Sequence, residues 1–377
     1  MPANPKRALD ALLRRGRLRH LEPRFGADFT SNDYLGLAES PELRAAVARA
    51  LDRGVPVGAG GSRLLRGNHN EHEALEAEAA RFFKAETALF FGGGFIANTA
   101  IFSTLPQRGD LIIYDALIHA SAHEGMRLSK AANVAARHND PQAFEDAIKS
   151  WRAGGGTGQP WIAVESLYSM DGDRAPLTAL AEIANRYDAL MVIDEAHATG
   201  VFGPEGRGLS AELEGRNNVI SLHTCGKALG ASGALVLASK TLRDFLINRA
   251  RAFIYATAPS PLIAASVRAA LQICAREPQR REMLHSRIAF AGKRLETRTG
   301  VTPSGSQIQP IIVGADSRAV ALAAALKASG FDIRAIRPPT VPEGTARLRM
   351  TLTLNTDEAA ITALIDALAE EQARLTS

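Results

Sequence analysis

The chain has 377 residues, of which 46% are hydrophobic and 22% are charged, and its 44 basic residues exceed its 40 acidic residues by only four. This length suffices for a large domain and a smaller one, and the sequence shows no apolar signal core, no membrane-spanning run and no basic run with interleaved aromatic residues. Membrane and nucleic-acid partners are therefore not expected, and two cysteines make neither a disulfide framework nor a metal cluster, so we expect a cytoplasmic enzyme.

The first elements are a basic helix over residues 6–20, an extended piece and the turn-rich segment 31–37. Over residues 71–85 apolar side chains recur at helical spacing, which predicts a second helix. Short apolar runs then alternate with helical stretches, a pattern typical of a mostly parallel sheet covered by helices on both faces. The predicted strands of this sheet span residues 88–91, 111–114, 161–165, 190–194, 219–222 and 233–238.

From about residue 275 the pattern changes, which predicts a second and smaller α/β domain. Its expected elements are helices over 280–298 and 315–329 and strands over 308–314, around Arg334 and over 347–353. Thr356 is placed to cap the last helix. We therefore predict an N-terminal helix and extended segment (1–35), a large domain (36–274) and a small C-terminal domain (275–377).

Polar residues follow several of the predicted strands directly. Asp194 ends one strand and His197 lies three residues beyond it. His119, Ser169 and Thr224 follow three other strands. Because ligands of parallel α/β sheets bind outside the carboxyl ends of the strands, these residues are expected to converge on one rim of the sheet.

A run of three glycines, residues 92–94, lies between a predicted strand and a predicted helix. Glycines let backbone N–H groups approach an anion, and the helix N-terminus adds a favourable partial charge. On its own such a run is more often a structural turn than a phosphate site. The glycine run therefore supports a phosphate site only in combination with other residues.

Two further features carry less weight. His119 and His123 are four residues apart, but the order H-E-x-x-H is absent, so no metal site is expected. Cys225 has no obvious partner that would make it a nucleophile, and we expect a small packing residue there.

Lys227 lies in a bend of small residues and admits three interpretations. A GxxxxGK[ST] phosphate loop would need glycine at position 221 and a hydroxyl at 228, and both are missing. A solvated turn lysine is the commonest fate of any lysine. The third interpretation is a lysine that holds pyridoxal phosphate (PLP) as a Schiff base. It is favoured because the sequence also provides Asp194, an imidazole and the glycine run, which are the groups that this cofactor requires.

Five motifs occur in the order seen in the α-oxoamine synthases, and the chain resembles this family over nearly its whole length. The motifs are SNDYLGL (31–37), GGGFIAN (92–98), DEAHATG (194–200), TCGKALG (224–230) and GTARLRMTLT (344–353). The resemblance implies the fold of the type I PLP enzymes and a homodimer whose active site lies at the subunit interface.

The resemblance also implies roles for individual residues. Lys227 would hold PLP and act as the general base on Cα of the amino acid. Asp194 would pair with the pyridinium nitrogen, and His197 would hydrogen-bond the ring hydroxyl, near Ser169. His119 would stack on the ring.

The remaining implied contacts concern the phosphate and the substrates. The phosphate would be bound by the backbone amides of Gly94 and Phe95, by Thr224, and by Thr257 of the partner subunit. Asn32 and Arg349 would hold the substrate carboxylate, and Arg19 is a candidate for the far end of the acyl substrate.

The implied reaction is the decarboxylative condensation of L-alanine with pimeloyl-CoA, or with pimeloyl-acyl carrier protein, to 8-amino-7-oxononanoate, CoA and CO2 in biotin biosynthesis. Two glycine-using activities of the same family, 2-amino-3-ketobutyrate CoA ligase and 5-aminolevulinate synthase, are the alternatives. A nucleotide-binding or NAD-dependent protein on a similar sheet is the alternative of another class. The missing phosphate-loop and dinucleotide patterns count against it.

Overall fold

The computed structural model describes residues 4–376 and divides into two compact units. The larger unit comprises Leu35–Ser169 and Arg174–Arg281. The smaller unit comprises Met1–Tyr34, Met170–Asp173 and Glu282–Ser377.

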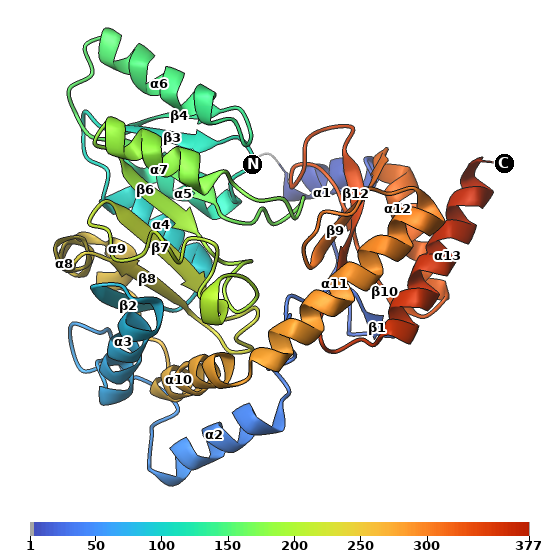
Figure 1. Ribbon diagram of the computed structural model, residues 1–377, viewed down its shortest axis with the longest axis horizontal. Coiled ribbons are helices and arrows are strands. Elements are labelled where there is room, and N and C mark those ends of the chain that lie inside the picture. Colours follow the sequence, from blue (N-terminus) through green and yellow to red (C-terminus); the bar gives the residue numbers. More distant parts are fainter. Residues whose placement is uncertain (1–3, 377) are drawn as a thin grey trace. The chain divides into compact units, whose positions relative to one another are not determined.

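The larger unit is built on a seven-stranded sheet of order β2-β8-β7-β6-β5-β3-β4 (Figure 1). The pairs from β7 to β4 are all parallel, whereas β8 runs antiparallel to both of its neighbours. The prediction of a mostly parallel sheet is therefore confirmed. The strands are β2 (Thr87–Phe91), β3 (Leu111–Asp115), β4 (Ala132–Ala136), β5 (Pro160–Glu165), β6 (Leu190–Asp194), β7 (Val219–Thr224) and β8 (Ala234–Ala238).

Strand β4 was not predicted from the sequence. It lies at one edge of the sheet, and four of its five residues are exposed. Its sequence, Ala-Asn-Val-Ala-Ala, is mostly alanine, a residue that is depleted in strands, so the segment does not stand out as a strand.

Helices cover both faces of this sheet, and the alternation of side chains along the strands explains how. On β5, Trp161 and Ala163 belong to one apolar cluster, whereas Ile162 and Val164 belong to another on the opposite face. The helices of this unit are α2 (Pro41–Asp52), α3 (Asn70–Phe83), α4 (Gly94–Thr104), α5 (Ala120–Leu128), α6 (Pro141–Ala153), α7 (Leu177–Arg186), the 3-10 turn η1 (Pro204–Gly206), α8 (Lys240–Arg249), α9 (Arg251–Ile254) and α10 (Pro261–Arg276).

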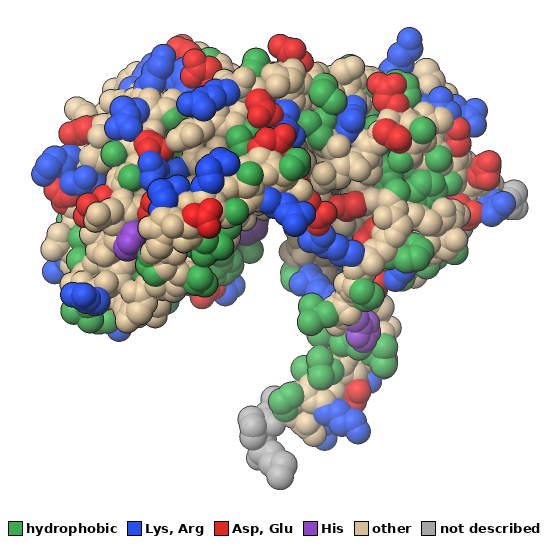
Figure 2. Space-filling model, turned by 90° about the horizontal axis from the view of Figure 1, so that it is seen from below, with side chains coloured by type: hydrophobic (Ala, Val, Ile, Leu, Met, Phe, Trp, Pro, Cys, Tyr) green, Lys and Arg blue, Asp and Glu red, His purple; other side chains and the backbone are tan. Residues whose placement is uncertain are grey.

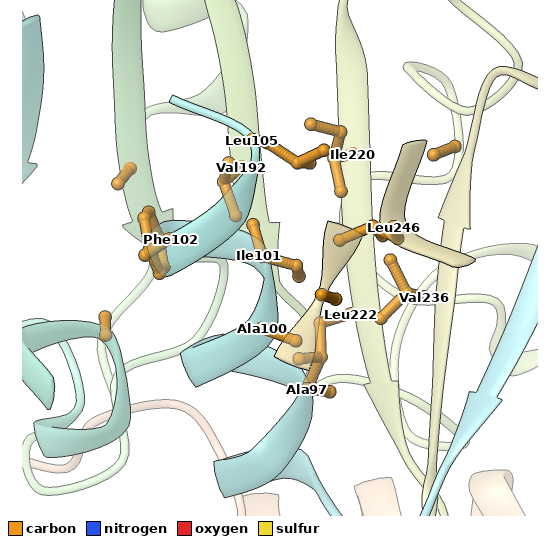
Figure 3. Packing of buried hydrophobic residues seen from close by; sticks show 14 of the residues in the cluster. Ala97, Ala100, Ile101, Phe102, Leu105, Val192, Ile220, Leu222, Val236 and Leu246 are labelled. Atoms are coloured by element: carbon orange, nitrogen blue, oxygen red, sulfur yellow. The ribbon is translucent and has the colours of Figure 1, made fainter. Parts of the chain in front are cut away.

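Helix α4 is the one that matters for the site, and its packing fixes its position. Figure 3 shows Ala97 and Ile101 of α4 close to Leu222 of β7, within one buried cluster. Because these side chains are fully buried against the sheet, the N-terminus of α4 is held at the rim where β6 and β7 end.

The smaller unit contains a three-stranded antiparallel sheet of order β11-β12-β9 and a short parallel pair of β1 with β10. Its apolar core includes buried side chains of α13 and β12, such as Ile365 and Leu348. Its elements are α1 (Pro5–Arg14), β1 (Ala27–Asp28), α11 (Pro278–Thr299, whose first residues belong to the larger unit), β9 (Ile308–Gly314), α12 (Asp316–Ala328), β10 (Phe331–Asp332), β11 (Ala335–Ile336), β12 (Ala346–Thr351) and α13 (Glu358–Thr376).

Two local expectations in this unit are wrong. The first helix was expected to reach residue 20 but ends at Arg14, because Gly16 adopts φ 64° and closes the helix with Gly16 N–H to Leu13 and Arg17 N–H to Leu12. Thr356 does not cap α13. The side chain of Asp357 does so, accepting from Ala360 N–H at 2.8 Å.

The surface carries both signs of charge. On the face shown in Figure 2, acidic and basic side chains are intermixed and do not separate into single-sign regions. Across residues 4–376, no helix has the length and apolarity needed to cross a membrane.

Candidate active site

A cavity of about 330 Å³ lies at the carboxyl-terminal rim of the large sheet, bounded by the N-terminus of α4 and by residues that follow β6 and β7. All of its lining residues belong to the larger unit. Seven residues predicted for the site line this one cavity: Gly94, Phe95, His119, Asp194, His197, Thr224 and Lys227.

One end of the cavity is suited to an anion. Gly93 precedes α4, and no described side chain caps the helix there. The first N–H groups of a helix have no partner within the helix, so they are available to a ligand. A Cβ on Gly94 would come within 2.6 Å of the Thr224 methyl group, so the close approach of α4 to Thr224 requires glycine. The glycine run therefore lets the uncapped start of α4 lie close to Thr224.

The Asp194 carboxylate is held firmly at the end of β6. Its Oδ2 accepts from Asn98 Nδ2 at 2.7 Å, and its Oδ1 accepts from Ala196 N–H at 2.9 Å. The side chain is buried yet lines the cavity. A carboxylate fixed in this way can pair with a protonated nitrogen of a ligand without having to reorient.

A chain of hydrogen bonds connects Asp194 to His119. Besides Asp194, Asn98 Nδ2 donates to Ser121 Oγ at 2.9 Å, and that oxygen lies 2.7 Å from His119 Nδ1. Nδ1 also accepts from the Ser121 N–H at 3.2 Å, so the proton of the neutral ring is on Nε2. Burial lowers the pKa of His119, which favours this neutral form.

Sequence reasoning missed Asn98 and Ser121 as members of the site. Asn98 is four residues beyond Gly94 in the same helix, so both lie on one face of α4. That spacing was a usable signal. Nothing local in the sequence identified Ser121, whose role depends on the neighbouring helix.

Lys227 reaches the cavity from the loop between β7 and β8. Its Nζ lies 3.0 Å from His197 Nε2. The small residues of this loop have a packing reason: Gly230 has φ 60°, and a Cβ there would come within 2.4 Å of the Ala38 nitrogen. Cys225 is fully buried, and burial raises the pKa of its thiol, which fits the expected packing residue.

Glu165 is a further cavity-lining residue that the sequence did not reveal. It ends β5, directly beside Asp194 on β6. Its Oε2 accepts from the backbone N–H of Ser169 at 3.0 Å, so the predicted site residue Ser169 is tied to the rim through its main chain.

Besides Ser169, four predicted residues lie outside the cavity lining. Thr257 is exposed in the segment between α9 and α10. In the smaller unit, Arg349 Nη2 donates to Asn32 Oδ1 at 3.1 Å, and Arg19 Nη2 donates to Thr340 Oγ1 at 3.1 Å. The predicted pair of Asn32 and Arg349 is thus in contact, whereas the roles of all four residues stay predictions.

Within the described part of the chain, no three or more His, Cys, Asp or Glu side chains lie together so that they could hold a metal ion.

The profile of the family "aminotransferase class I and II" matches residues 26–368. The chain belongs to this family.

Relatives within the family carry one recurring name. The 8-amino-7-oxononanoate synthase of Chromobacterium violaceum is 44% identical over 340 residues, which cover 90% of this chain and 87% of the relative. The protein of the same name from Anaeromyxobacter dehalogenans is 41% identical and covers 96% of this chain, with 93% of its own length aligned.

Solved structures with a similar fold include a protein of the same name. The 8-amino-7-oxononanoate synthase of Francisella tularensis superposes with a TM-score of 0.79 at 28% identity, over 93% of this chain and 99% of that one. A high-resolution structure of SPT with a PLP internal aldimine gives a TM-score of 0.85 at 26% identity, over 93% of this chain and 88% of that one. The predictions of a fold type I transferase, of PLP as cofactor and of α-oxoamine synthase ancestry are therefore confirmed.

The residues of the cavity fit this cofactor. The uncapped N-terminus of α4 and the Thr224 hydroxyl suit a phosphate, the fixed Asp194 carboxylate suits a pyridinium nitrogen, and Lys227 supplies the amine. Anion cradle, carboxylate and amine line a single cavity, as one bound molecule of PLP requires.

Proposed function

We propose that this cytoplasmic protein catalyses the decarboxylative condensation of L-alanine with a pimeloyl thioester to 8-amino-7-oxononanoate, CoA (or free acyl carrier protein) and CO2. The observation that carries this function is the presence of the complete PLP donor set, with Lys227 at its centre, in a chain 41–44% identical to synthases of that name. PLP supplies an electron sink for the charge that develops at Cα of alanine.

Lys227 has two tasks in this proposal. Its Nζ holds the cofactor, and it then takes the proton from Cα of alanine and returns a proton to Cα after CO2 has left. His197 Nε2, 3.0 Å away, is within hydrogen-bonding distance of Nζ and keeps the amine in place for both transfers. His197 would also hydrogen-bond the ring hydroxyl, with Ser169 close by.

The other cavity residues bind and orient. The amides of Gly94 and Phe95 would hold the phosphate together with Thr224, and Asp194 would keep the ring nitrogen protonated. His119 would stack on the ring. The hydrogen bond from Asn98 fixes the Asp194 carboxylate, so that the carboxylate need not reorganise as charge enters the ring.

The remaining roles concern the substrates and the partner subunit. Asn32 and Arg349 bind the carboxylate of alanine, and Arg19 meets the terminal carboxylate of the pimeloyl group. In the proposed homodimer, Thr257 of the partner subunit completes the phosphate site. The exposure of Thr257 in the single chain agrees with a role outside its own cavity.

A comparison of steady-state specificity constants tests the proposal. Alanine with pimeloyl-CoA should give the largest value, ahead of glycine with acetyl-CoA and glycine with succinyl-CoA. One methyl group contributes only about 1–3 kcal/mol of discrimination, so glycine should react weakly with pimeloyl-CoA and not be excluded. A larger specificity constant for either glycine pair would show that the protein has one of the glycine-using activities instead.

A further inference from the structure

Two buried carboxyl groups stand side by side at the rim of the cavity. Glu165 on β5 and Asp194 on β6 are directly paired in the parallel ladder, so their side chains point to the same face of the sheet. Both line the cavity, and only 2% of the Glu165 surface is exposed. Two neighbouring buried carboxylates repel each other, so one of the two is expected to hold a proton.

Their hydrogen bonds are unequal. Each oxygen of Asp194 has an N–H donor, from Asn98 or from Ala196. Glu165 accepts one N–H, from Ser169, through Oε2, whereas Oε1 is buried and finds no partner among residues 4–376. A buried ionised oxygen without a donor is costly, whereas a protonated oxygen can donate to a ligand.

The acidic groups around Glu165 also favour its protonated form. Strand β5 lies between β6, which ends in Asp194, and β3, which ends in Asp115. Asp115 is held as a carboxylate by His138 Nδ1 at 2.8 Å and by two backbone N–H groups. Burial and these two aspartates raise the pKa of Glu165 to about 8, although Lys227 across the cavity and the Ser169 amide act against them.

We propose that Glu165 is a neutral carboxylic acid that donates its Oε1 proton into the cavity, where it hydrogen-bonds an acceptor oxygen of bound PLP and positions the cofactor. Asp194 then remains the carboxylate that faces the cofactor, and the two carboxyl groups divide the roles of donor and acceptor. The inference rests on the proposed function only through the cofactor, and it is independent of the amino acid and the acyl thioester.

The protonation state is tested on the protein without cofactor by infrared difference spectroscopy at pH 6. Wild type minus Glu165→Gln should show the C=O stretching band of a buried carboxylic acid, which shifts in D2O. Glu145→Gln is the matched control, because Tyr187, Lys149 and Arg186 lower the pKa of Glu145 to about 2 and its removal should leave that band unchanged. The absence of the band from the first difference spectrum would overturn the proposal.

Cofactor binding tests the donated hydrogen bond. At pH 7, Glu165→Gln still offers an N–H donor and should bind PLP within about 3-fold of wild type, whereas Glu165→Met, of similar size but without a donor, should bind about tenfold more weakly, the effect of one hydrogen bond. Equal affinities of the two variants would refute the donor role. A wrong substrate assignment would change neither measurement, and if the methionine variant does not fold, the infrared result decides.

Discussion

Replacement of Asn98 by alanine tests the hydrogen-bond network that fixes Asp194. Asn98 Nδ2 donates to the Asp194 carboxylate at 2.7 Å and to Ser121 Oγ at 2.9 Å. A bond to a charged group contributes about 1.5–3 kcal/mol and a neutral one about 0.5–1.5 kcal/mol. Within the described structure Asn98 Oδ1 is buried without a partner, and its removal offsets the loss of the two bonds by about 1–3 kcal/mol, the cost of burying an unpaired oxygen. The net effect of Asn98→Ala is therefore expected to be a decrease of about 1–2 kcal/mol in the free energy of unfolding.

Urea unfolding of the protein without cofactor, followed by tryptophan fluorescence, measures this change. Both tryptophans, Trp151 and Trp161, lie in the larger unit and report on it. Thr99→Ala is the matched control, since the Thr99 hydroxyl donates to Phe95 O within the same helix, and the loss of this bond should stay within about 0.5 kcal/mol. The variant at position 98 should also lose PLP faster on dialysis. If it matches the control in both measurements, the network does not support Asp194.

Three further outcomes are expected. Lys227→Ala should lose turnover but keep some PLP bound without a covalent bond. Lys240 is an exposed lysine paired with Asp244, and Lys240→Ala should keep the turnover of wild type. Near-normal turnover of Lys227→Ala with added PLP would reject the assignment. Asp194→Asn should slow the exchange of the alanine Cα proton in deuterated buffer, and exchange at the wild-type rate would reject its role. The folded state raises the pKa of Glu165 from 4.5 to about 8, so the contribution of this group to stability is complete below pH 4.5 and is lost as the pH rises through about 8. The loss is at most ~1.4 kcal/mol per pH unit. The difference in unfolding free energy between wild type and Glu165→Gln should therefore fall between pH 4.5 and about 8, and a difference that does not change with pH would contradict this.

The strands of the large sheet could be predicted because each buried strand is an apolar run of its own. Strand β6, for example, was expected over residues 190–194 and spans Leu190–Asp194. The exposed edge strand β4 is mostly alanine, which is depleted in strands, and so gives no clear strand signal. The end of α1 depends on one glycine, Gly16, whose left-handed conformation stops a basic pattern that continues beyond it.

The site could be predicted where a residue follows a strand or belongs to a motif, as Asp194, Thr224 and Lys227 do. Asn98 and Glu165 were missed, because the sequence marks Asn98 only by its spacing of four residues from Gly94, and the partner that makes each residue important is distant in the sequence. Asn98 matters through its bond to Asp194, 96 residues away in sequence, and Glu165 through its pairing with the same aspartate. Strand order sets the second pairing and the packing of α4 on the sheet sets the first, and neither is encoded in a local pattern.

The proposed function depends above all on a covalent bond between PLP and Lys227 in this cavity. Borohydride reduction of the PLP-loaded protein, followed by proteolysis and mass spectrometry, tests it directly. We expect a phosphopyridoxyl group on Lys227 Nζ, absent from Lys227→Ala treated in the same way. A label on another lysine, or none in a protein that has bound PLP, would contradict it.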